Sequence, residues 1–443
     1  MKKTICELFA WVWWFRVWFE ILNKWWKTVW ANQREPNQKW QYAFNCYINH
    51  FWKKKIHVNE DIWTIDKKII PSHNLLVWWF PCQDYSVAST WAKWIQGKKW
   101  VLRRQIREIL IAKKPSFVLL ENVDRLLKSP RTQKWRDFGV ILQTFKEEWY
   151  TVEWRVINAA EYWFVQKRKR TFIFASRNET NYARNLQNMT FEKIIHKDWF
   201  FVKEFPIIKS TVWKEYDFNF KNLLSVSDNF ELKFLNTWIM RNWKIYTEET
   251  VPNYKWEYAL LKDVLEKKVD DKYNIKVNLQ KWKDLKWSKA IPKKVWDYEY
   301  IYREWAMAFP DSLEKPARTM LTSEWTLNRS SHIIKNWKKY RILTPIETER
   351  INGFPDNWTD TWMPERYRYF CMGNALVVGL IEKMWHRLNT IFRKEGKIQS
   401  KKKQYKPKNK AFLNIRLLSV WSLYAVLWYW KQAQKELKHE RYL

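Results

Sequence analysis

A cysteine and a glutamate stand where two short apolar runs end, and they could supply nucleophilic and acid chemistry. Cys82 lies in the stretch FPCQD, and Glu121 closes the apolar run 117–120. A thiolate on a loop at the end of a strand is placed to attack a carbon. A carboxyl desolvated at the end of an apolar run has a raised pKa and can donate a proton. The alternatives are a core-filling cysteine and a helix-capping glutamate; the polar neighbours of Cys82 disfavour the first.

A basic run supplies the next candidate site. Residues 166–170 are QKRKR and precede an apolar strand. Because side chains alternate along a strand, Arg168 and Arg170 lie on one face. That face suits a phosphate or hydrogen bonds to a substrate base, and the alternative is a solvated basic surface.

The first apolar run ends in a possible ligand-binding turn. Residues 8–15 are LFAWVWWF, which becomes LFAGVGGF if glycine replaces tryptophan. A glycine-rich strand-to-helix turn lets the backbone approach a nucleotide-like ligand, and the alternative is a tryptophan-rich amphipathic helix. Glu35 and Asp61 follow the next two strands, where carboxylates suit ribose hydroxyls and an adenine amino group. Each could equally be a surface acid or a helix cap.

Alternating apolar runs and helical patterns must position these residues. This rhythm extends over residues 1–180 and predicts an α/β fold with a doubly wound, mostly parallel sheet. The predicted strands are 4–10, 28–31, 75–77, 117–120 and 170–175, and the predicted helices are 103–112 and 138–148.

The remaining chain predicts a second, smaller domain and a return segment. Residues 181–325 are lysine-rich and aromatic without a clear period. Residues 341–390 resume dense patterning and end in an amphipathic helix at 374–388, and the return segment is assigned to 326–395. Residues 396–443 contain a basic linker at 401–410 and an apolar run at 412–430. A packed helix, a membrane-associating segment and a run foreign to the native reading frame all stay open for the latter.

The charge balance favours a polyanionic partner. The chain carries 81 Lys plus Arg against 46 Asp plus Glu, for a formal net charge of +35. Nucleic acid is the first candidate and an anionic membrane surface the second, while a lysine-rich proteome is the alternative. The 4 cysteines form no CxxC pair and no His–Cys cluster, which disfavours a zinc site or disulfide framework and suits a reducing cytoplasm.

The glycine and tryptophan contents are both anomalous. The chain has 36 Trp and 6 Gly, whereas glycine is about 7% of an ordinary chain. Tryptophan occupies turn-like places, such as residues 13–14, 25–26, 78–79 and 336–338, the last of sequence NWK. Asn-Gly is a turn signal and Asn-Trp is not. We hypothesise that most of these residues are glycine in the native protein, because UGA encodes Trp in some genetic codes and Gly in others. The alternative is an aromatic-rich protein that binds membrane surfaces or carbohydrate.

Taken in order, the motifs resemble the cytosine-5 DNA methyltransferase family. They are PCQ at 81–83, ENV at 121–123, QxRxR at 166–170, a block from Arg341 to Trp358 containing LTPxExxRxxGFPxxW, and GNA at 373–375. The resemblance covers residues 5–175 and about 305–385. It implies a Rossmann-like methyltransferase fold that uses S-adenosylmethionine, with 1–180 and 326–395 forming the catalytic domain and 181–325 the target recognition domain.

The resemblance also implies residue roles. Cys82 resembles the nucleophile, Glu121 the proton donor, and Arg168 a residue that helps to hold a flipped cytosine. Gln33 is an alternative to Glu35 at the ribose. The implied methyl-donor pocket comprises Phe9, Ala10, Trp11, Trp13, Trp14, Glu35, Asp61, Ile62, Pro81, Asn374 and Ala375. The implied DNA and base contacts are Gln83, Ser86, Asn122, Val123, Gln166 and Arg170.

The sequence departs from the family mainly where tryptophan replaces glycine. Trp154 and Trp358, in contrast, stand where the family tolerates or prefers tryptophan. The glycine-like positions are Trp11, Trp13, Trp14, Trp18, Trp78, Trp79, Trp100, Trp135, Trp163 and Trp325.

The chemistry implied by the resemblance is covalent. A cytosine leaves the duplex, the Cys82 thiolate attacks C6, and Glu121 stabilises or protonates N3. C5 then takes the methyl group, and loss of the C5 proton eliminates Cys82. The implied partner is double-stranded DNA, in a restriction-modification or DNA-protection setting with a separately acting restriction endonuclease. We expect a monomer in a bacterial or phage-infected cytoplasm, with no metal and no membrane partner.

Two alternatives stay open. One is an RNA cytosine-5 methyltransferase with the same chemistry. The other is a catalytically inactive DNA-binding protein, which would follow if the tryptophans are genuine and their indoles fill the donor pocket.

Overall fold

A computed structural model gives the structure of the protein. The chain divides into two units, residues 2–393 and residues 394–443 with Met1, and the account below concerns the first. Within the described ranges, no helix is both long and apolar enough to cross a membrane. The described residues are 1–12, 15–16, 25–35, 38–52, 54–79, 98–129, 133–254, 258–295, 298–336 and 339–404.

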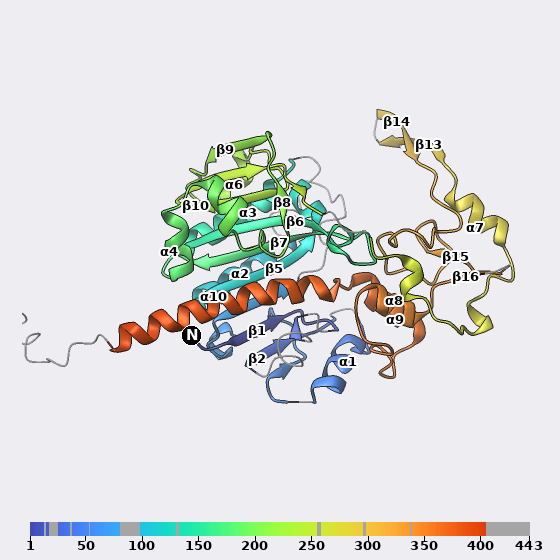
Figure 1. Cartoon of the computed structure of the whole chain (residues 1–443), viewed down its shortest axis with the longest axis horizontal. Coiled ribbons are helices and arrows are strands. Elements are labelled where there is room, and N and C mark those ends of the chain that lie inside the picture. The colour runs from blue at the N-terminus through green and yellow to red at the C-terminus, as the bar shows by residue number, and fades with distance from the viewer. Residues whose placement is uncertain are drawn as a thin grey trace, which may run out of the picture. The chain divides into compact units, whose positions relative to one another are not determined.

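The core is one ten-stranded sheet (Figure 1). Its strands lie in the order β3-β2-β1-β4-β5-β7-β6-β10-β11-β9. The five strands from β3 to β5 are parallel to one another, and every later pairing is antiparallel. The bounds are β1 Thr4–Leu8, β2 Lys27–Asn32, β3 His57–Val58, β4 Leu75–Trp79, β5 Phe117–Val123, β6 Tyr150–Asn158, β7 Lys169–Arg177, β9 Trp213–Asp217, β10 Thr237–Arg241 and β11 Lys244–Glu248.

The strand sequences explain the burial of the sheet centre. β4 is LLVWW and β5 is FVLLENV, and almost every side chain in both is buried. Continuous apolar runs of this kind suit strands that are covered on both faces. The α/β fold with parallel strands predicted for residues 1–180 is confirmed, and the predicted strands and helices of that region correspond to β1, β2, β4, β5, β7, α2 (Lys98–Lys113) and α3 (Arg136–Glu147).

Two helices, α1 (Tyr42–Phe51) and α10 (Val378–Gln404), accompany the parallel part of the sheet. α1 follows β2, and α10 runs across the sheet in Figure 1. Phe392 of α10 packs on Phe117 at the start of β5, with ring centroids 5.1 Å apart. The helix predicted at 374–388 corresponds to α10, which begins later, at Val378, and continues beyond residue 388, whereas Asn374 is the last residue of α9 (Glu365–Asn374). Residues 401–404, expected to start a linker, are the last turn of α10.

Part of the expected second domain belongs to the sheet. β9, β10 and β11 all fall within 181–325, yet β10 pairs with β6 and extends the antiparallel half. The edge of the sheet therefore does not coincide with the boundary expected at residue 181. Smaller elements here are α4 Asn181–Gln187, α5 Phe191–Lys193, α6 Leu223–Asn229, and the paired strands β8 Ile207–Ile208 and β12 Val251–Pro252.

Residues 258–342 contain two short ribbons outside that sheet. One is β13 (Lys289–Val295) with β14 (Tyr298–Glu304), which follows α7 (Leu279–Lys286). The other is β15 (Ile333–Asn336) with β16 (Lys339–Ile342).

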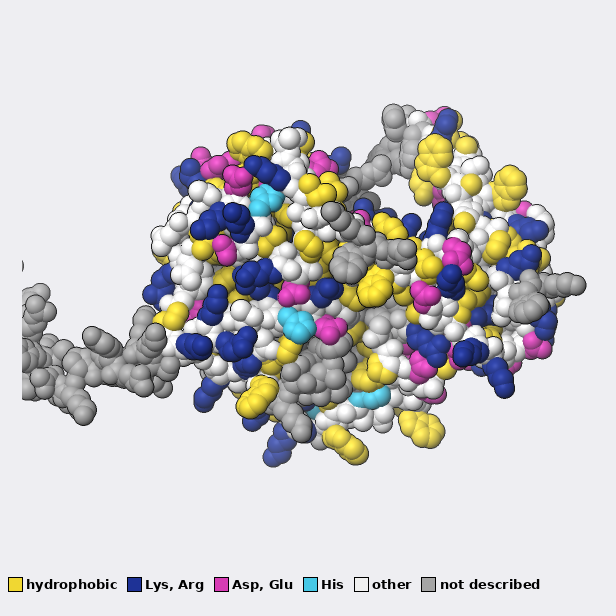
Figure 2. Space-filling view, viewed as in Figure 1, with side chains coloured by type: hydrophobic (Ala, Val, Ile, Leu, Met, Phe, Trp, Pro, Cys, Tyr) yellow, Lys and Arg dark blue, Asp and Glu magenta, His cyan; other side chains and the backbone are white. Residues whose placement is uncertain are grey.

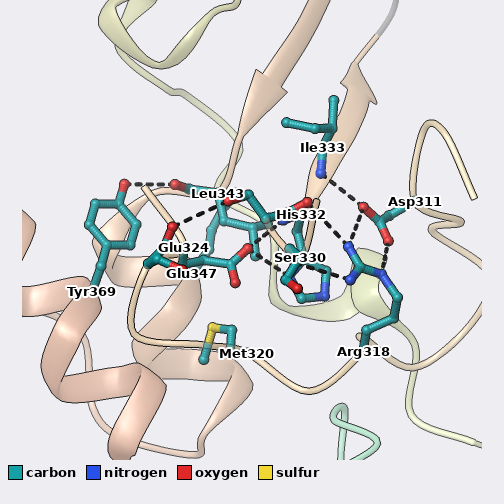
Figure 3. Close-up of polar contacts among 12 residues, drawn as sticks. Asp311, Arg318, Met320, Glu324, Ser330, His332, Ile333, Leu343, Glu347 and Tyr369 are labelled. Atoms are coloured by element: carbon teal, nitrogen blue, oxygen red, sulfur yellow. Dashed lines mark hydrogen bonds and ion pairs between the residues drawn. The ribbon is translucent and has the colours of Figure 1, made fainter. Parts of the chain in front are cut away.

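Buried polar groups hold the loops around these ribbons (Figure 3). Arg318 donates to both carboxylate oxygens of Asp311, at 2.6 and 3.1 Å. The same carboxylate accepts from the backbone N–H of Ile333 at 2.9 Å. His332 lies 2.7 Å from Glu324, and both side chains are buried. Together with buried apolar side chains such as Met320 and Ile333, this network of buried polar groups fixes the conformation of the loops.

Candidate active site

Glu121 is the carboxylate that the fold prepares for chemistry. It lies at the C-terminal end of β5, fully buried. Its Oε1 pairs with Nε of Arg170 at 2.9 Å, while its Oε2 has no hydrogen-bond partner among the described residues. Burial raises the pKa of Glu121 to about 7, against the lowering effects of Arg170 and Arg168. The carboxyl can therefore hold a proton near neutral pH and has an oxygen free to present it.

The strand register brings Arg170 to Glu121. β7 runs antiparallel to β5, with Arg170 opposite Val123 and Phe172 opposite Glu121. Sequence alternation placed Arg168 and Arg170 on one face but gave no way to know the partner strand. The ion pair between Arg170 and Glu121 was therefore not predicted.

Arg168 and Gln166, which lie just before β7, form hydrogen bonds with residues of the C-terminal part of the chain. The Arg168 guanidinium is buried and donates to the backbone carbonyls of Met320 at 3.1 Å and Gly373 at 2.9 Å. Gln166 donates to Asn352 at 3.0 Å and accepts from Arg168 at 3.2 Å. Through hydrogen bonds to the backbone of Met320 and Gly373, these two side chains hold those segments in place. Their expected contacts with the substrate base and DNA stay predictions.

The predicted nucleophile is close to Glu121 in register. Trp79, the last residue of β4, pairs with Glu121 of β5, and Cys82 follows it by three positions in the chain. Cys82, Pro81, Gln83 and Ser86 lie outside the described residues. Of the other predicted base contacts, Asn122 is buried and Val123 is half-buried, both next to Glu121 at the end of β5.

The first strand ends in a tryptophan that fills the expected donor pocket. Trp11 has a backbone φ of 48° and is only 7% exposed. Its backbone N–H donates to Oε1 of Gln33 at 2.8 Å, and its indole N–H donates to the carbonyl of Cys371 at 3.3 Å. Its ring lies 5.8 Å from the rings of Trp79 and Phe370. The indole thus occupies the space where the ends of β1, β2 and β4 meet α9.

The other predicted pocket residues surround that indole or support it. Phe9 has φ 52° and stacks on Trp78 at 5.5 Å. Ala10 is buried, and its N–H donates to the carbonyl of Asn32 at 2.9 Å. Trp13 and Trp14 lie outside the described residues. Ile62 and Ala375 are buried and Asn374 ends α9.

The acid after β2 is engaged inside the protein. Glu35 accepts from the backbone N–H of Ala43 at 3.2 Å, in the first turn of α1, and from the Tyr367 hydroxyl. Burial raises the pKa of Glu35, and those two hydrogen bonds oppose the rise. Gln33, not Glu35, reaches the turn after β1 through Trp11. Asp61, after β3, accepts from the backbone N–H of Trp63 at 3.2 Å.

The block from Arg341 to Trp358 proves to be a scaffold. Thr344 caps α8 (Pro345–Ile351) in a reciprocal capping box with Glu347, and Arg341 forms a buried bidentate pair with Glu347 at 2.6 and 2.7 Å. Glu349 accepts from Arg368 at 3.0 Å. Asn352 donates to the carbonyl of Met372 at 3.1 Å. Satisfied buried polar groups are costly to break, which accounts for a motif that composition could not explain.

Comparison with known proteins decides the family. The family model for C-5 cytosine-specific DNA methylase matches residues 3–390. The chain belongs to this family. It is 44% identical over 401 residues to the Type II methyltransferase M.Sau3AI of Staphylococcus aureus, covering 88% of this chain and 96% of that protein. It is 22% identical to the Type II methyltransferase M.Bsp6I of a Bacillus species, covering 81% and 90%.

Solved structures of low identity share the methylase fold. The Dnmt2 methyltransferase of S. pombe aligns with a TM-score of 0.55 at 14% identity, over 87% of this chain and 97% of that one. The Entamoeba histolytica methyltransferase EhMeth aligns with a TM-score of 0.52 at 15% identity, over 88% and 98%. This C-5 cytosine methylase is a DNA (cytosine-5-)-methyltransferase, and its methyl donor is S-adenosylmethionine.

The residues at the donor pocket of this methylase do not fit that donor. At the position predicted to approach the donor, the indole of Trp11 is 7% exposed, and the two N–H groups of this residue are bonded to the protein. The fold and the family agree on the donor, whereas this buried indole takes up space in the predicted pocket.

Proposed function

We propose that the chain methylates a flipped cytosine within a specific DNA sequence through a covalent adduct on Cys82, with Glu121 as the proton donor. The observation that supports this most directly is the state of Glu121. It is a buried carboxyl with a pKa of about 7, one oxygen on Arg170 and the other without a partner among the described residues.

The other cysteines are poor nucleophiles. Cys6, Cys46 and Cys371 are all buried. Burial raises the pKa of Cys46 to about 12 and raises the pKa of Cys6 and of Cys371 well above the ordinary value for a thiol. A thiol held protonated does not attack. Of the four cysteines, Cys82 is left as the candidate, three positions after Trp79, which pairs with Glu121 in register.

Each group has a defined part in the addition step. Attack of the Cys82 thiolate on C6 moves electrons through the pyrimidine ring toward N3. The neutral Glu121 carboxyl transfers its proton to N3, which prevents negative charge from building on the ring. The carboxylate left behind stays paired with Arg170, 2.9 Å away. C5 of the adduct is then electron-rich and ready for methylation. In the proposal, Arg168 keeps its role of orienting the base-binding edge through the backbone of Gly373.

We assign DNA reading to the chain outside the central sheet. The β13–β14 ribbon pairs only with itself among the described strands, and a two-stranded ribbon fits the major groove of B-DNA. Arg303 is exposed and Lys289 half-buried on it, and both can meet phosphates, while Ile291 and Ile301 are exposed apolar groups that can meet thymine methyls. Lysine and arginine side chains also cover much of the surface in Figure 2. The target recognition domain proposed for 181–325 is thus centred on residues 258–325.

The biological setting completes the proposal. The names of M.Sau3AI and M.Bsp6I, both Type II methyltransferases, favour a restriction-modification system with a separately acting endonuclease. We propose a monomer working in a bacterial or phage-infected cytoplasm without a metal ion.

Trapping on modified DNA tests the covalent step. DNA carrying 5-fluorocytosine cannot lose its C5 substituent, so the enzyme should stay attached in a denaturant-resistant complex. Cys82→Ser should abolish the complex, because a hydroxyl is a far weaker nucleophile than a thiolate. Cys46→Ala, which removes a buried thiol, is the matched control and should still be trapped.

The assay should be run on two versions of the chain, because Trp11 fills the donor pocket. One is the chain as written, and the other is a five-glycine version with Trp11→Gly, Trp13→Gly, Trp14→Gly, Trp78→Gly and Trp79→Gly. Trapping that survives Cys82→Ser, or no trapping in either version, would contradict the proposed function.

A further inference from the structure

Tryptophan dominates the left-handed backbone positions. Of the 12 non-glycine residues with positive φ in the described chain, seven are tryptophan, although the whole chain has 36 Trp among 443 residues. Positive φ is uncommon outside glycine, with asparagine the main exception, and is a steric outlier for a bulky side chain. The seven are Trp11 (φ 48°), Trp52 (55°), Trp135 (68°), Trp149 (62°), Trp163 (71°), Trp243 (62°) and Trp362 (64°).

Two of these positions lie in turns whose backbone geometry favours glycine. β10 and β11 are joined by two residues, Asn242 and Trp243, with φ values of 49° and 62°. A two-residue hairpin with positive φ at both positions is the type I′ turn, whose preferred sequence is Asn-Gly. Trp149 stands just past the end of α3, after its C-cap Glu148. That position commonly adopts the left-handed conformation and is usually glycine.

Four of these seven indoles are mostly exposed to solvent. Trp52, Trp149, Trp163 and Trp362 are 78%, 65%, 62% and 97% exposed. Figure 2 shows large hydrophobic side chains protruding singly at the lower edge of the surface. A strained backbone is normally retained only where the surrounding structure over-determines it or a function uses it. Exposed indoles at turns supply no such constraint.

The glycines that are present lie elsewhere. Gly139, Gly373, Gly379 and Gly396 are all helical, and only Gly353, with φ 78°, has positive φ among the described glycines. Gly373 is fixed by packing, since a Cβ there would lie 2.3 Å from the backbone nitrogen of Thr322. Turns that favour glycine therefore hold tryptophan, while helices, which disfavour glycine, hold glycine.

Other tryptophans are buried and hydrogen-bonded through the indole N–H, as is usual for this residue. Trp238 is buried in β10, and its indole N–H donates to the carbonyl of Leu235 at 2.6 Å. Trp358 is 7% exposed, stacks on His50 at 4.2 Å, and donates to the carbonyl of Val12 at 3.4 Å. Neither has positive φ. The chain thus holds two structural classes of tryptophan.

We infer that the functional polypeptide carries glycine at the seven left-handed tryptophan positions, and that glycine at position 11 opens the methyl-donor pocket. The gene then has UGA codons at these seven positions, in cells that translate UGA as glycine, and UGG at positions 238 and 358. The inference extends the sequence hypothesis from composition to named positions, of which 11, 135 and 163 were already suspected from the family pattern. It also removes the conflict between this chain and the donor that its family uses.

The codons and the native protein test the inference without any assay of activity. UGA is expected at positions 11, 52, 135, 149, 163, 243 and 362. Peptide mass spectrometry of protein purified from cells that carry the gene should give glycine masses at the same positions and tryptophan masses at 238 and 358. UGG codons or tryptophan masses at the seven positions would overturn the inference.

Paired variants test the physical reason. Replacing the six left-handed tryptophans other than Trp11 with glycine should raise the melting temperature of the chain as written, because strain is relieved at all six positions and only Trp135 among them packs against the hydrophobic core. Trp238→Gly is the matched control and should lower it, because it leaves a cavity. A lower melting temperature for the six-position variant would contradict the inference.

Donor binding tests position 11 separately. S-adenosylmethionine titrated by calorimetry should bind the Trp11→Gly chain and should not bind the chain as written. Equal binding by both would overturn the role given to position 11. The proposed function would survive that result, because trapping of Cys82 on 5-fluorocytosine DNA is measured independently.

Discussion

Two glutamates on the strands at either side of β7 are equally buried but have different hydrogen-bond partners. Glu121 of β5 pairs in register with Phe172 of β7, and Glu153 of β6 pairs with Phe174. Both carboxyls are fully buried, and burial raises the pKa of each to about 7. They differ in their partners: Glu153 accepts from the Tyr182 hydroxyl at 2.7 Å and from the Phe200 N–H at 2.8 Å.

The difference separates a structural acid from the proposed proton donor. Both oxygens of Glu153 are hydrogen-bonded to groups of the protein, so neither is available to transfer a proton to a substrate. Glu121 has a charged partner on one oxygen and no partner for the other among the described residues. A raised pKa alone therefore marks neither a catalytic nor a structural role; the unoccupied oxygen at the strand end makes the distinction.

Glu121→Gln should have the largest effect. The amide keeps the shape of the side chain but cannot supply the acidic proton, so methyl transfer should fall by at least about 100-fold, the lower range for general acid catalysis. Incorporation of labelled methyl groups into DNA by the five-glycine version measures it. A variant that keeps wild-type turnover would remove Glu121 from the mechanism.

Arg170→Ala should change the pH profile as well as the rate. Arg170 lowers the pKa of Glu121 against the effect of burial, so its loss should raise that pKa further. The proton donor would then stay protonated to higher pH, and the alkaline limb of the rate profile should move upward in pH. Arg170→Lys, which keeps the charge, should restore most of the original profile. An unmoved limb in the alanine variant would show that Arg170 does not act through Glu121.

Glu153→Gln should affect stability and leave methyl transfer per folded molecule unchanged. The amide oxygen can still accept from the Phe200 N–H, but the Tyr182 hydroxyl must turn to accept from the amide NH2 in place of donating, and the loss of its present hydrogen bond costs about 1 kcal/mol. The pH dependence gives the clearer signature. Between pH 4.5 and 7 the native carboxyl keeps its proton while the unfolded one loses it, so the native state loses relative stability as pH rises.

Thermal melts across pH 4.5 to 7 measure that slope. Glu121→Gln and Glu153→Gln should each flatten part of it, and the double variant should flatten both parts. Equal loss of methyl transfer in the two single variants would erase the distinction between the two acids.

The sequence was enough to identify much of the fold and little of the ion pairing. Apolar runs predicted β1, β2, β4, β5 and β7 because these strands are buried, but β6, of sequence YTVEWRVIN, was missed because its buried Glu153 and Arg155 break the apolar pattern. The role of Glu121 was visible from the apolar run before it. Its partner Arg170 was not, because antiparallel register is a tertiary property.

Roles that depend on tertiary contacts were harder still. The polar neighbours of Cys82 favoured it from sequence, but the burial of the other three cysteines was not predicted, and the scaffold of Arg341, Glu347 and Glu349 depends on contacts with distant segments. Turn chemistry was the exception. Tryptophan at glycine-like places was suspected from sequence at positions 11, 135 and 163, and these positions have positive φ. Positions 78 and 79, expected in a turn, lie in β4. Neither these two nor position 325 is among the positive-φ residues, so backbone strain does not bear on them.

A buried base in the loop network of residues 258–342 should give the smallest effect and the opposite sign. Burial lowers the pKa of Lys286 to about 8, although Asp311, 3.7 Å away, acts to raise it. Between pH 8 and the ordinary value of 10.5, the unfolded lysine holds a proton that the native one has lost, so the contribution of this residue to stability rises with pH. Lys286→Met should remove that rise in melts between pH 8 and 10 and leave the range from pH 4.5 to 7 unchanged. It should also leave the pH profile of methyl transfer unchanged, because Lys286 belongs to the Asp311–Arg318 network, which makes no contact with Glu121 in the described structure. A shift in that profile would mean that the two regions are coupled, and that the division between reactive and structural buried charges does not hold.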